Sequence, residues 1–158
     1  GSGRVEVGDF IYSPAAVGDV EANQLQNTAI GSIMIGTSVS DFVRRATALE
    51  LERSGLEIVS DAPLMVTGDV KEFLLDDLGY SVDWSYSINY RLQNAQSGEP
   101  IIDKLYKTPT VTTGKFGLPS DLTPSINQMI LNSLEQFIRD VRESGVFTEE
   151  TSSSGESS

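Results

Sequence analysis

The sequence predicts an α+β fold, a two-layer sandwich in which two helices cover one face of a mostly antiparallel sheet. Three observations predict this class. One long segment alternates apolar and polar residues, two others carry apolar residues at helical spacing, and the order along the chain is strand, helix, three-strand meander, helix. Strict alternation indicates a strand with one buried face, and helices bury their apolar stripes against such a sheet.

The first expected strand covers residues 4–12, where apolar residues alternate but change phase at Gly8. A glycine at such a phase change indicates a β-bulge. Residues 13–37 are rich in proline, glycine and asparagine, which favours turns. Within them, the apolar stretch 30–35 is a candidate for a short extra strand.

The first helix is expected to begin after Ser38 or Ser40, since either serine can cap it. Gly55 marks its end, because glycine accepts the left-handed conformation that closes many helices. The helical spacing of its apolar residues predicts a buried side made of Phe42, Val43, Ala46 and Leu49.

The meander is predicted from residues 64–75, 80–92 and 101–113. In the first of these strands, Gly68 leaves room for a neighbouring backbone. In the third, Pro109 indicates an edge position or a bulge. The middle strand has the strictest alternation, and its apolar side consists of Tyr80, Val82, Trp84, Tyr86, Ile88, Tyr90 and Leu92.

The last helix is expected to begin at Thr123, as its cap, with Pro124 at its first position. Gly145 marks its end. Its apolar residues form one stripe, which should pack on the sheet beside the first helix: Ile126, Met129, Ile130, Leu134, Phe137, Ile138 and Val141.

The chain length fits a single domain, which we place at residues 4–147. Residues 1–3 are typical of a cloning remnant, so we expect any native leader to lie upstream of them. Residues 148–158 are acidic and serine-rich without a large apolar side chain, and we expect a disordered tail there. No apolar run approaches the length needed to span a bilayer.

Composition narrows the function. The chain has 11 lysines and arginines against 23 aspartates and glutamates, a net charge of −12, which disfavours nucleic acid as a partner. It has no cysteine and no histidine, which excludes thiolate nucleophiles, imidazole bases and most transition-metal sites. We therefore expect a binding protein without a cofactor or a metal rather than an enzyme.

Three segments are candidates for a partner surface. The polar side of the strand over 80–92 would face solvent if both helices cover the other side. The long segment 21–36 carries hydrogen-bonding side chains and is either a recognition loop or a plain connection. The last strand, with its lysines and Pro109, is either a protected edge or an acceptor for a partner strand. The candidate residues are Ser81, Asp83, Ser85, Ser87, Asn89 and Arg91 in the strand, and Asn23, Gln24, Gln26 and Asn27 in the loop.

Two alternatives remain open beside binding. Asp76 and Asp77, with Asp83 or Lys71 in support, are candidates for a carboxylate-dependent hydrolase or an oxygen-ligand cation site. The competing interpretation, which we prefer, places Asp76 and Asp77 in a hairpin turn. The other alternative is a small-ligand carrier with a cavity between sheet and helices, which requires an unfilled core beneath Trp84.

Two stretches resemble a known family: TAIGSIMIGTSVSDFVRRATALEL over residues 28–51 and GDVKEFLLDDLGYSVDWSYSINYRL over residues 68–92. With the order of strands and helices, they make most of residues 4–144 similar to the YajG-like family of bacterial lipoproteins. The resemblance implies a lipidated cysteine upstream and a domain anchored in the Gram-negative envelope, facing the periplasm. By analogy of fold with other small envelope lipoproteins, we expect an accessory or assembly factor that binds a protein or another envelope component. The resemblance itself supplies no catalytic residues.

Overall fold

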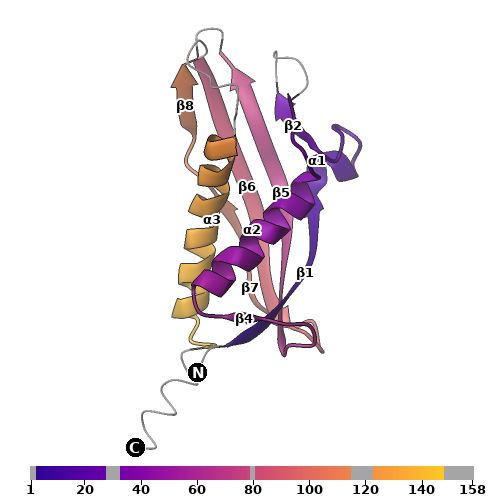
Figure 1. The fold of residues 1–158 in the computed structure, drawn as a ribbon, viewed down its shortest axis with the longest axis vertical. Coiled ribbons are helices and arrows are strands. Elements are labelled where there is room, and N and C mark those ends of the chain that lie inside the picture. The colour runs from indigo at the N-terminus through magenta and orange to yellow at the C-terminus, as the bar shows by residue number, and fades with distance from the viewer. Residues whose placement is uncertain (1–2, 28–32, 79–80, 115–122, 148–158) are drawn as a thin grey trace, which may run out of the picture.

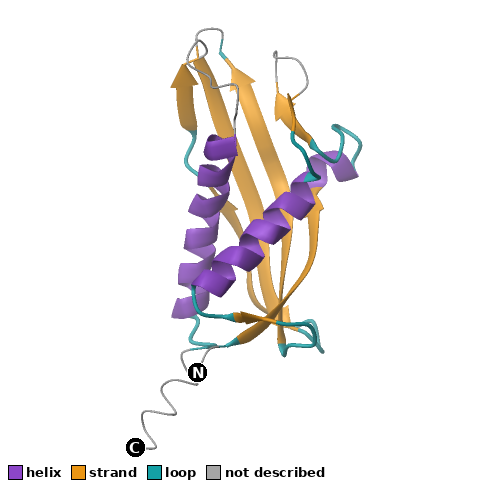
Figure 2. Ribbon diagram, in the orientation of Figure 1, coloured by secondary structure: helices purple, strands orange, loops and turns teal. Residues whose placement is uncertain are grey.

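The computed structural model describes residues 3–27, 33–78, 81–114 and 123–147, and it confirms the predicted two-layer α+β fold. Helices α2 and α3 lie on one face of a mixed sheet (Figures 1 and 2). None of the described helices is both long and apolar enough to cross a membrane. The elements are β1 (Arg4–Tyr12), α1 (Ser13–Ala16), β2 (Gln24–Asn27), β3 (Ile33–Met34), α2 (Val39–Arg53), β4 (Glu57–Ile58), β5 (Leu64–Asp77), β6 (Ser81–Asn94), β7 (Pro100–Lys107), β8 (Val111–Gly114) and α3 (Thr123–Glu143).

The sheet is built on the long antiparallel pair β5 and β6, and each outer side of this pair is shared by two shorter strands. On the β5 side, β1 and β2 both run parallel to β5, one after the other along its length. On the β6 side, β7 and β8 both run antiparallel to β6. The predicted meander is therefore confirmed, although its third strand breaks between β7 and β8, where Pro109 supplies no backbone donor.

The bulge predicted in β1 is confirmed by a register shift between Val7 and Phe10. Arg44 of α2 stabilises it, because its guanidinium donates to the carbonyl oxygens of Gly8 and Val7, both at 3.0 Å. Gly68 does leave room, but for a side chain rather than a backbone. A Cβ at Gly68 would lie 2.5 Å from the ring of Phe10, which pairs with Gly68 across the strands.

Helix α2 begins and ends as predicted. The Ser38 hydroxyl accepts a hydrogen bond from the backbone N–H of Asp41 at 3.2 Å. Gly55, with a φ of 104°, closes the helix in a Schellman motif, in which Leu56 donates to Leu51. Its predicted buried side is partly wrong, because Leu49 is 47% exposed. The fully buried positions are Val39, Val43, Thr47 and Leu51.

The core lies between the sheet and the two helices. Helix α3 buries nearly all of its predicted stripe, with Ile138 half-buried. The ring of Phe137 stacks on Tyr90 of β6, with centroids 4.4 Å apart, and meets the edge of Tyr106 of β7 at 5.8 Å. At this aromatic cluster, side chains of the helix layer and of the sheet layer are therefore in direct contact. Tyr80, the first residue of the apolar side predicted for the strand over 80–92, lies outside the described residues.

Two predictions about connections are corrected. Residues 21–36 are more than a loop: they contain β3, the short strand expected within 30–35, and also β2, which was not expected and pairs with both β3 and β5. Asp76 and Asp77 belong to β5 rather than to a turn, because they pair with Asp83 and Val82. The backbone bond from the N–H of Leu78 to the carbonyl of Ser81, at 2.9 Å, lies beyond them. The pairing of β5 with β6 therefore extends through Asp76 and Asp77, although aspartates are common in turns.

Candidate functional site

The candidate surface is the open face of the sheet, on the side opposite α2 and α3. Six polar residues of β6 were expected there, and alternation places them on this face. Ser81 and Ser87 are nevertheless buried, while Asp83, Ser85 and the remaining two are half-buried. Ser87, for example, is a short side chain that lies between the longer side chains of Glu72 on β5 and Lys107 on β7, which pair with it.

Asn89 and Arg91 converge on one carboxylate, that of Asp103 in β7. Asn89 donates to one oxygen of Asp103 at 2.7 Å, and Arg91 donates to the other at 3.2 Å. Arg91 also donates to the carbonyl of Gly98 at 2.9 Å and to the side chain of Gln93 at 2.7 Å. Further along β6, Asp83 accepts a hydrogen bond from Thr112 at 2.7 Å. These polar residues therefore tie the strands together while remaining partly accessible.

Apolar residues that the sequence analysis missed flank this polar centre. Ile11 of β1 and Leu105 of β7 are both 51% exposed. The registers place Ile11 opposite Asp69, Asp69 opposite Asn89, and Asn89 opposite Leu105, so the four form one row across four strands. We call Ile11, Asp69, Asn89 and Leu105 the cross-sheet row. Its signal in the sequence is that Ile11 and Leu105 each precede a buried tyrosine and so point the other way.

The described candidate side chains of 21–36 bond within their own segment or to β5. Asn23 donates to the carbonyl of Ile35 at 3.1 Å, and the side chain of Gln24 accepts from the backbone of Glu21 at 3.0 Å. Gln26 accepts from the backbone N–H of Phe73 on β5 at 3.0 Å. The side chain of Asn27 lies outside the described residues.

Within the described part of the 21–36 segment, Gln26 connects to the surface formed by β6. Gln26 pairs with Leu74, which pairs with Ser85. This row links the candidate residues of the 21–36 segment to the candidate residues of β6.

The acidic residues named for a hydrolase or a cation site lie on two adjacent strands. Asp76 and Asp83 lie directly opposite each other on β5 and β6. Within the described part of the chain, no three acidic side chains come together as metal ligands would. Lys71 instead pairs with Asp69 at 2.7 Å, and the same carboxylate accepts from Ser13 at 2.6 Å. The side chain of Asp77 is outside the described residues.

On the helix side, one carboxylate fastens α3 to β7. Asp140 accepts hydrogen bonds from Tyr106 at 2.7 Å and from Lys104 at 3.1 Å. The Lys104 ammonium also lies 5.2 Å from the centre of the Tyr106 ring. The hydrogen bond from Tyr106 is the main cause that lowers the pKa of Asp140, and burial is the main cause that raises the pKa of Tyr106.

The lowered pKa of Asp140 predicts a pH dependence of stability. A carboxyl whose pKa is lower in the folded state stabilises the fold above its unfolded pKa of about 3.9, and this contribution disappears as the pH falls through the folded pKa. The wild type should therefore be more stable than Asp140→Asn near neutral pH, by about 1 kcal/mol at most. Urea titrations should show this difference shrinking below about pH 4. A difference that stays constant down to that range would contradict the assignment.

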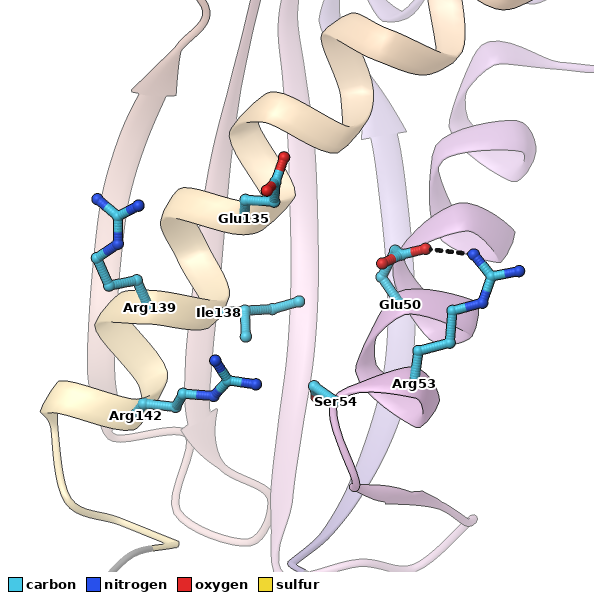
Figure 3. Close-up of a pocket in the computed structure, with 7 residues that line it drawn as sticks. All are labelled: Glu50, Arg53, Ser54, Glu135, Ile138, Arg139 and Arg142. Atoms are coloured by element: carbon cyan, nitrogen blue, oxygen red, sulfur yellow. Dashed lines mark hydrogen bonds and ion pairs between the residues drawn. The ribbon is translucent and has the colours of Figure 1, made fainter.

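A cleft of about 350 Å³ lies where the C-terminal ends of α2 and α3 approach each other (Figure 3). Ile138 and Arg142 extend from α3 toward α2, whereas Arg139 points away. Arg53 is paired with Glu50 at 2.8 Å. Charges of both signs line the cleft, and arginines at helix C-termini also compensate the helix dipoles. The complete lining is Glu50, Arg53, Ser54, Glu135, Ile138, Arg139 and Arg142.

A second hollow, of about 460 Å³, lies at the end of the sheet near the turn between β6 and β7. Glu6 and Asp61 are its acidic residues, and Glu6 accepts a hydrogen bond from the backbone of Asp61 at 3.2 Å. Neither hollow contains Asp76 or Asp83. The carboxylates proposed for hydrolysis therefore do not line either of these concave sites.

Several solved structures share this fold. XCC0632 from Xanthomonas campestris, of the DUF330 family, matches with a TM-score of 0.61 and 14% identity over 98% of this chain and 90% of its own. The hypothetical protein CT253 from Chlamydia trachomatis matches with 0.60 and 9% over 92% and 97%. A candidate lipoprotein from Caulobacter crescentus CB15 matches with 0.51 and 15% over 73% and 86%. No protein-family model matches the chain, and no curated protein matches it by sequence.

Proposed function

We propose that this protein is a non-enzymatic binding domain of a bacterial envelope lipoprotein, which holds a protein or another envelope component on the open face of its sheet. The cross-sheet row carries this proposal. It presents Ile11 and Leu105 on either side of the polar pair Asp69 and Asn89. Exposed apolar residues around a polar centre provide both contact area and orientation for a partner.

Two observations support the envelope setting. The two quoted stretches resemble the YajG-like lipoproteins, and the fold is shared with the Caulobacter candidate lipoprotein. The proposal includes membership of the YajG-like family, an N-terminal lipid anchor and a domain that faces the periplasm of a Gram-negative bacterium. Fatty-acid labelling of the native precursor tests the anchor, and a precursor that takes up no label contradicts it.

A matched pair of variants tests the binding surface. Ile11→Asp places a charge in the cross-sheet row, and Leu49→Asp places the same charge on α2 at nearly equal exposure, 51% against 47%. Crosslinking from envelope extracts should show about a tenfold loss of capture for Ile11→Asp and none for Leu49→Asp, because charge in an apolar contact of an interface costs binding energy. Circular dichroism checks that both variants fold. Equal capture by the two variants would contradict this surface.

A further inference from the structure

Strand β7 forms an outer edge of the described sheet, since it pairs with β6 and with no other described strand. The backbone N–H of Thr108 donates to the carbonyl of Tyr86 on β6, at 3.0 Å. The backbone groups of Thr108, and of every second residue before it, therefore point toward β6. Directions alternate along a strand, so the N–H and C=O groups of Asp103, Leu105 and Lys107 point outward. These groups are available for a further strand.

The usual protection of an edge strand by lysine is incomplete here. Lys104 is held on the helix side by Asp140, at 3.1 Å, and lies over the ring of Tyr106. Leu105 is 51% exposed on the open face, and Ile101, at the irregularity near the start of β7, is 42% exposed. An exposed edge with apolar side chains is a template for another strand. Pro109 occupies the next outward position and lacks an N–H, so such a ladder would end there.

We propose that this edge pairs antiparallel with the β7 edge of a second copy of the chain, about a two-fold axis at Leu105. Residues that meet across such an axis must lie on the same face of the joined sheet. Four registers pair at least five of the eight residues of β7. The register centred on Ile102 opposes the apolar Ile101 to the charged Asp103 and includes Pro100, which has no N–H. The register centred on Asp103 opposes two aspartates, and the register centred on Lys104 opposes two lysines, which are repulsive pairs.

The register centred on Leu105 opposes no like charges. Leu105 meets Leu105 of the second copy, and Asp103 meets Lys107 of the second copy, twice by symmetry. On the helix side Lys104 falls opposite the buried Tyr106 of the second copy, so the two lysines do not meet, and each stays on Asp140 of its own chain. Asp103, Leu105 and Lys107 then each form a hydrogen-bonded pair with a residue of the second copy. About six backbone hydrogen bonds join the two copies. The open faces become one surface across both copies.

The charges around the contact also permit it. Each copy carries a net charge of −12, but Asp103, Lys104, Lys107 and Asp140 sum to zero at this edge. Repulsion between more distant charges is screened beyond about 8 Å at physiological salt. The inference does not depend on the lipid anchor or on the identity of the partner of the open face.

A disulfide tests the geometry directly, because the chain has no cysteine. In a hydrogen-bonded antiparallel pair the two Cα atoms are about 5.5 Å apart, within the range of a disulfide. Under mild oxidation, Leu105→Cys should form a covalent dimer at least about tenfold faster than Ile11→Cys, which has the same 51% exposure on β1. Equal rates for the two variants would overturn the proposal.

Charge exchange tests the register. Sedimentation from micromolar to millimolar concentration should show a wild-type dimer, and Lys107→Glu and Asp103→Lys should each raise its Kd about tenfold, because symmetry repeats each unfavourable pair. Mixing the two variants should restore a dimer, since Asp103 then meets Lys107, and the new lysine meets the new glutamate. Arg45→Glu, the same charge change on α2, should leave the Kd unchanged. A monomeric wild type, a dimer insensitive to Lys107→Glu or a mixture that stays monomeric would each overturn the proposal.

Discussion

Replacement of Phe137 by alanine is expected to lower the free energy of unfolding by about 3–5 kcal/mol. Phe137 is fully buried on α3, stacked on Tyr90 and in edge contact with Tyr106. The loss combines the transfer of a large ring from water with the cavity left between the layers. Chemical denaturation monitored by circular dichroism measures it, and the fluorescence of Trp84 provides a second probe.

Two control variants show whether the loss of stability is specific to the buried ring of Phe137. Phe137→Leu keeps most of the volume and should cost clearly less, about 1–2 kcal/mol. Leu49→Ala changes a residue that is 47% exposed on α2 and should stay within about 0.5 kcal/mol. If Phe137→Ala cost no more than Leu49→Ala, the contact between α3 and the sheet would not rest on the aromatic cluster.

The elements that the sequence predicted well are those with a long, strict period. Strand β6 and helix α3 each repeat their pattern over many residues, and both bury the predicted side. Capping chemistry was equally informative, because Ser38 and Gly55 have local conformational roles that do not depend on distant contacts. Short strands such as β4, with two residues, have no period of their own and form because a neighbour offers its edge.

The buried side of α2 shows why apolar periodicity alone was insufficient. Val39, Val43, Thr47 and Leu51 follow one another at four-residue steps, which places them along one stripe. Leu49 is two residues from both Thr47 and Leu51, about 200° around the helix, and so points away from that stripe. Burial of Thr47 was not predicted, because threonine carries a polar hydroxyl. In the structure this hydroxyl makes its hydrogen bonds inside the protein.

The candidate surface was predicted in part for a similar reason. Alternation identifies the face of β6 on which Ser81, Ser85 and Ser87 lie, but it cannot tell how far the adjacent strands cover each side chain. Ser81 and Ser87 proved to be buried, and Ser85 half-buried. Ile11 and Leu105 became part of the surface only through the strand registers, which depend on contacts between distant segments.

Replacement of Thr47 by valine is expected to cost about 1–3 kcal/mol, although valine has nearly the same shape. The Thr47 hydroxyl donates to the carbonyl of Val43 at 2.8 Å, so the Tyr90 hydroxyl, 2.9 Å away, donates to Thr47. Both residues are fully buried. Valine leaves the tyrosine hydroxyl without its acceptor in a place that water does not reach, and thermal or urea unfolding measures the cost.

A double-mutant cycle separates this bond from general effects on packing. Tyr90→Phe keeps the ring on Phe137 and removes the hydroxyl, so it should cost about 0.5–1.5 kcal/mol. In the combined Thr47→Val and Tyr90→Phe variant no buried hydroxyl is left unpaired at this contact, and the total loss should fall below the sum of the two single losses by about 1 kcal/mol or more. Burial is also the main cause that raises the pKa of Tyr90, which the bond to Thr47 opposes. Additive losses would show that the two hydroxyls do not share a hydrogen bond, and that the helix is held to the sheet by apolar packing alone.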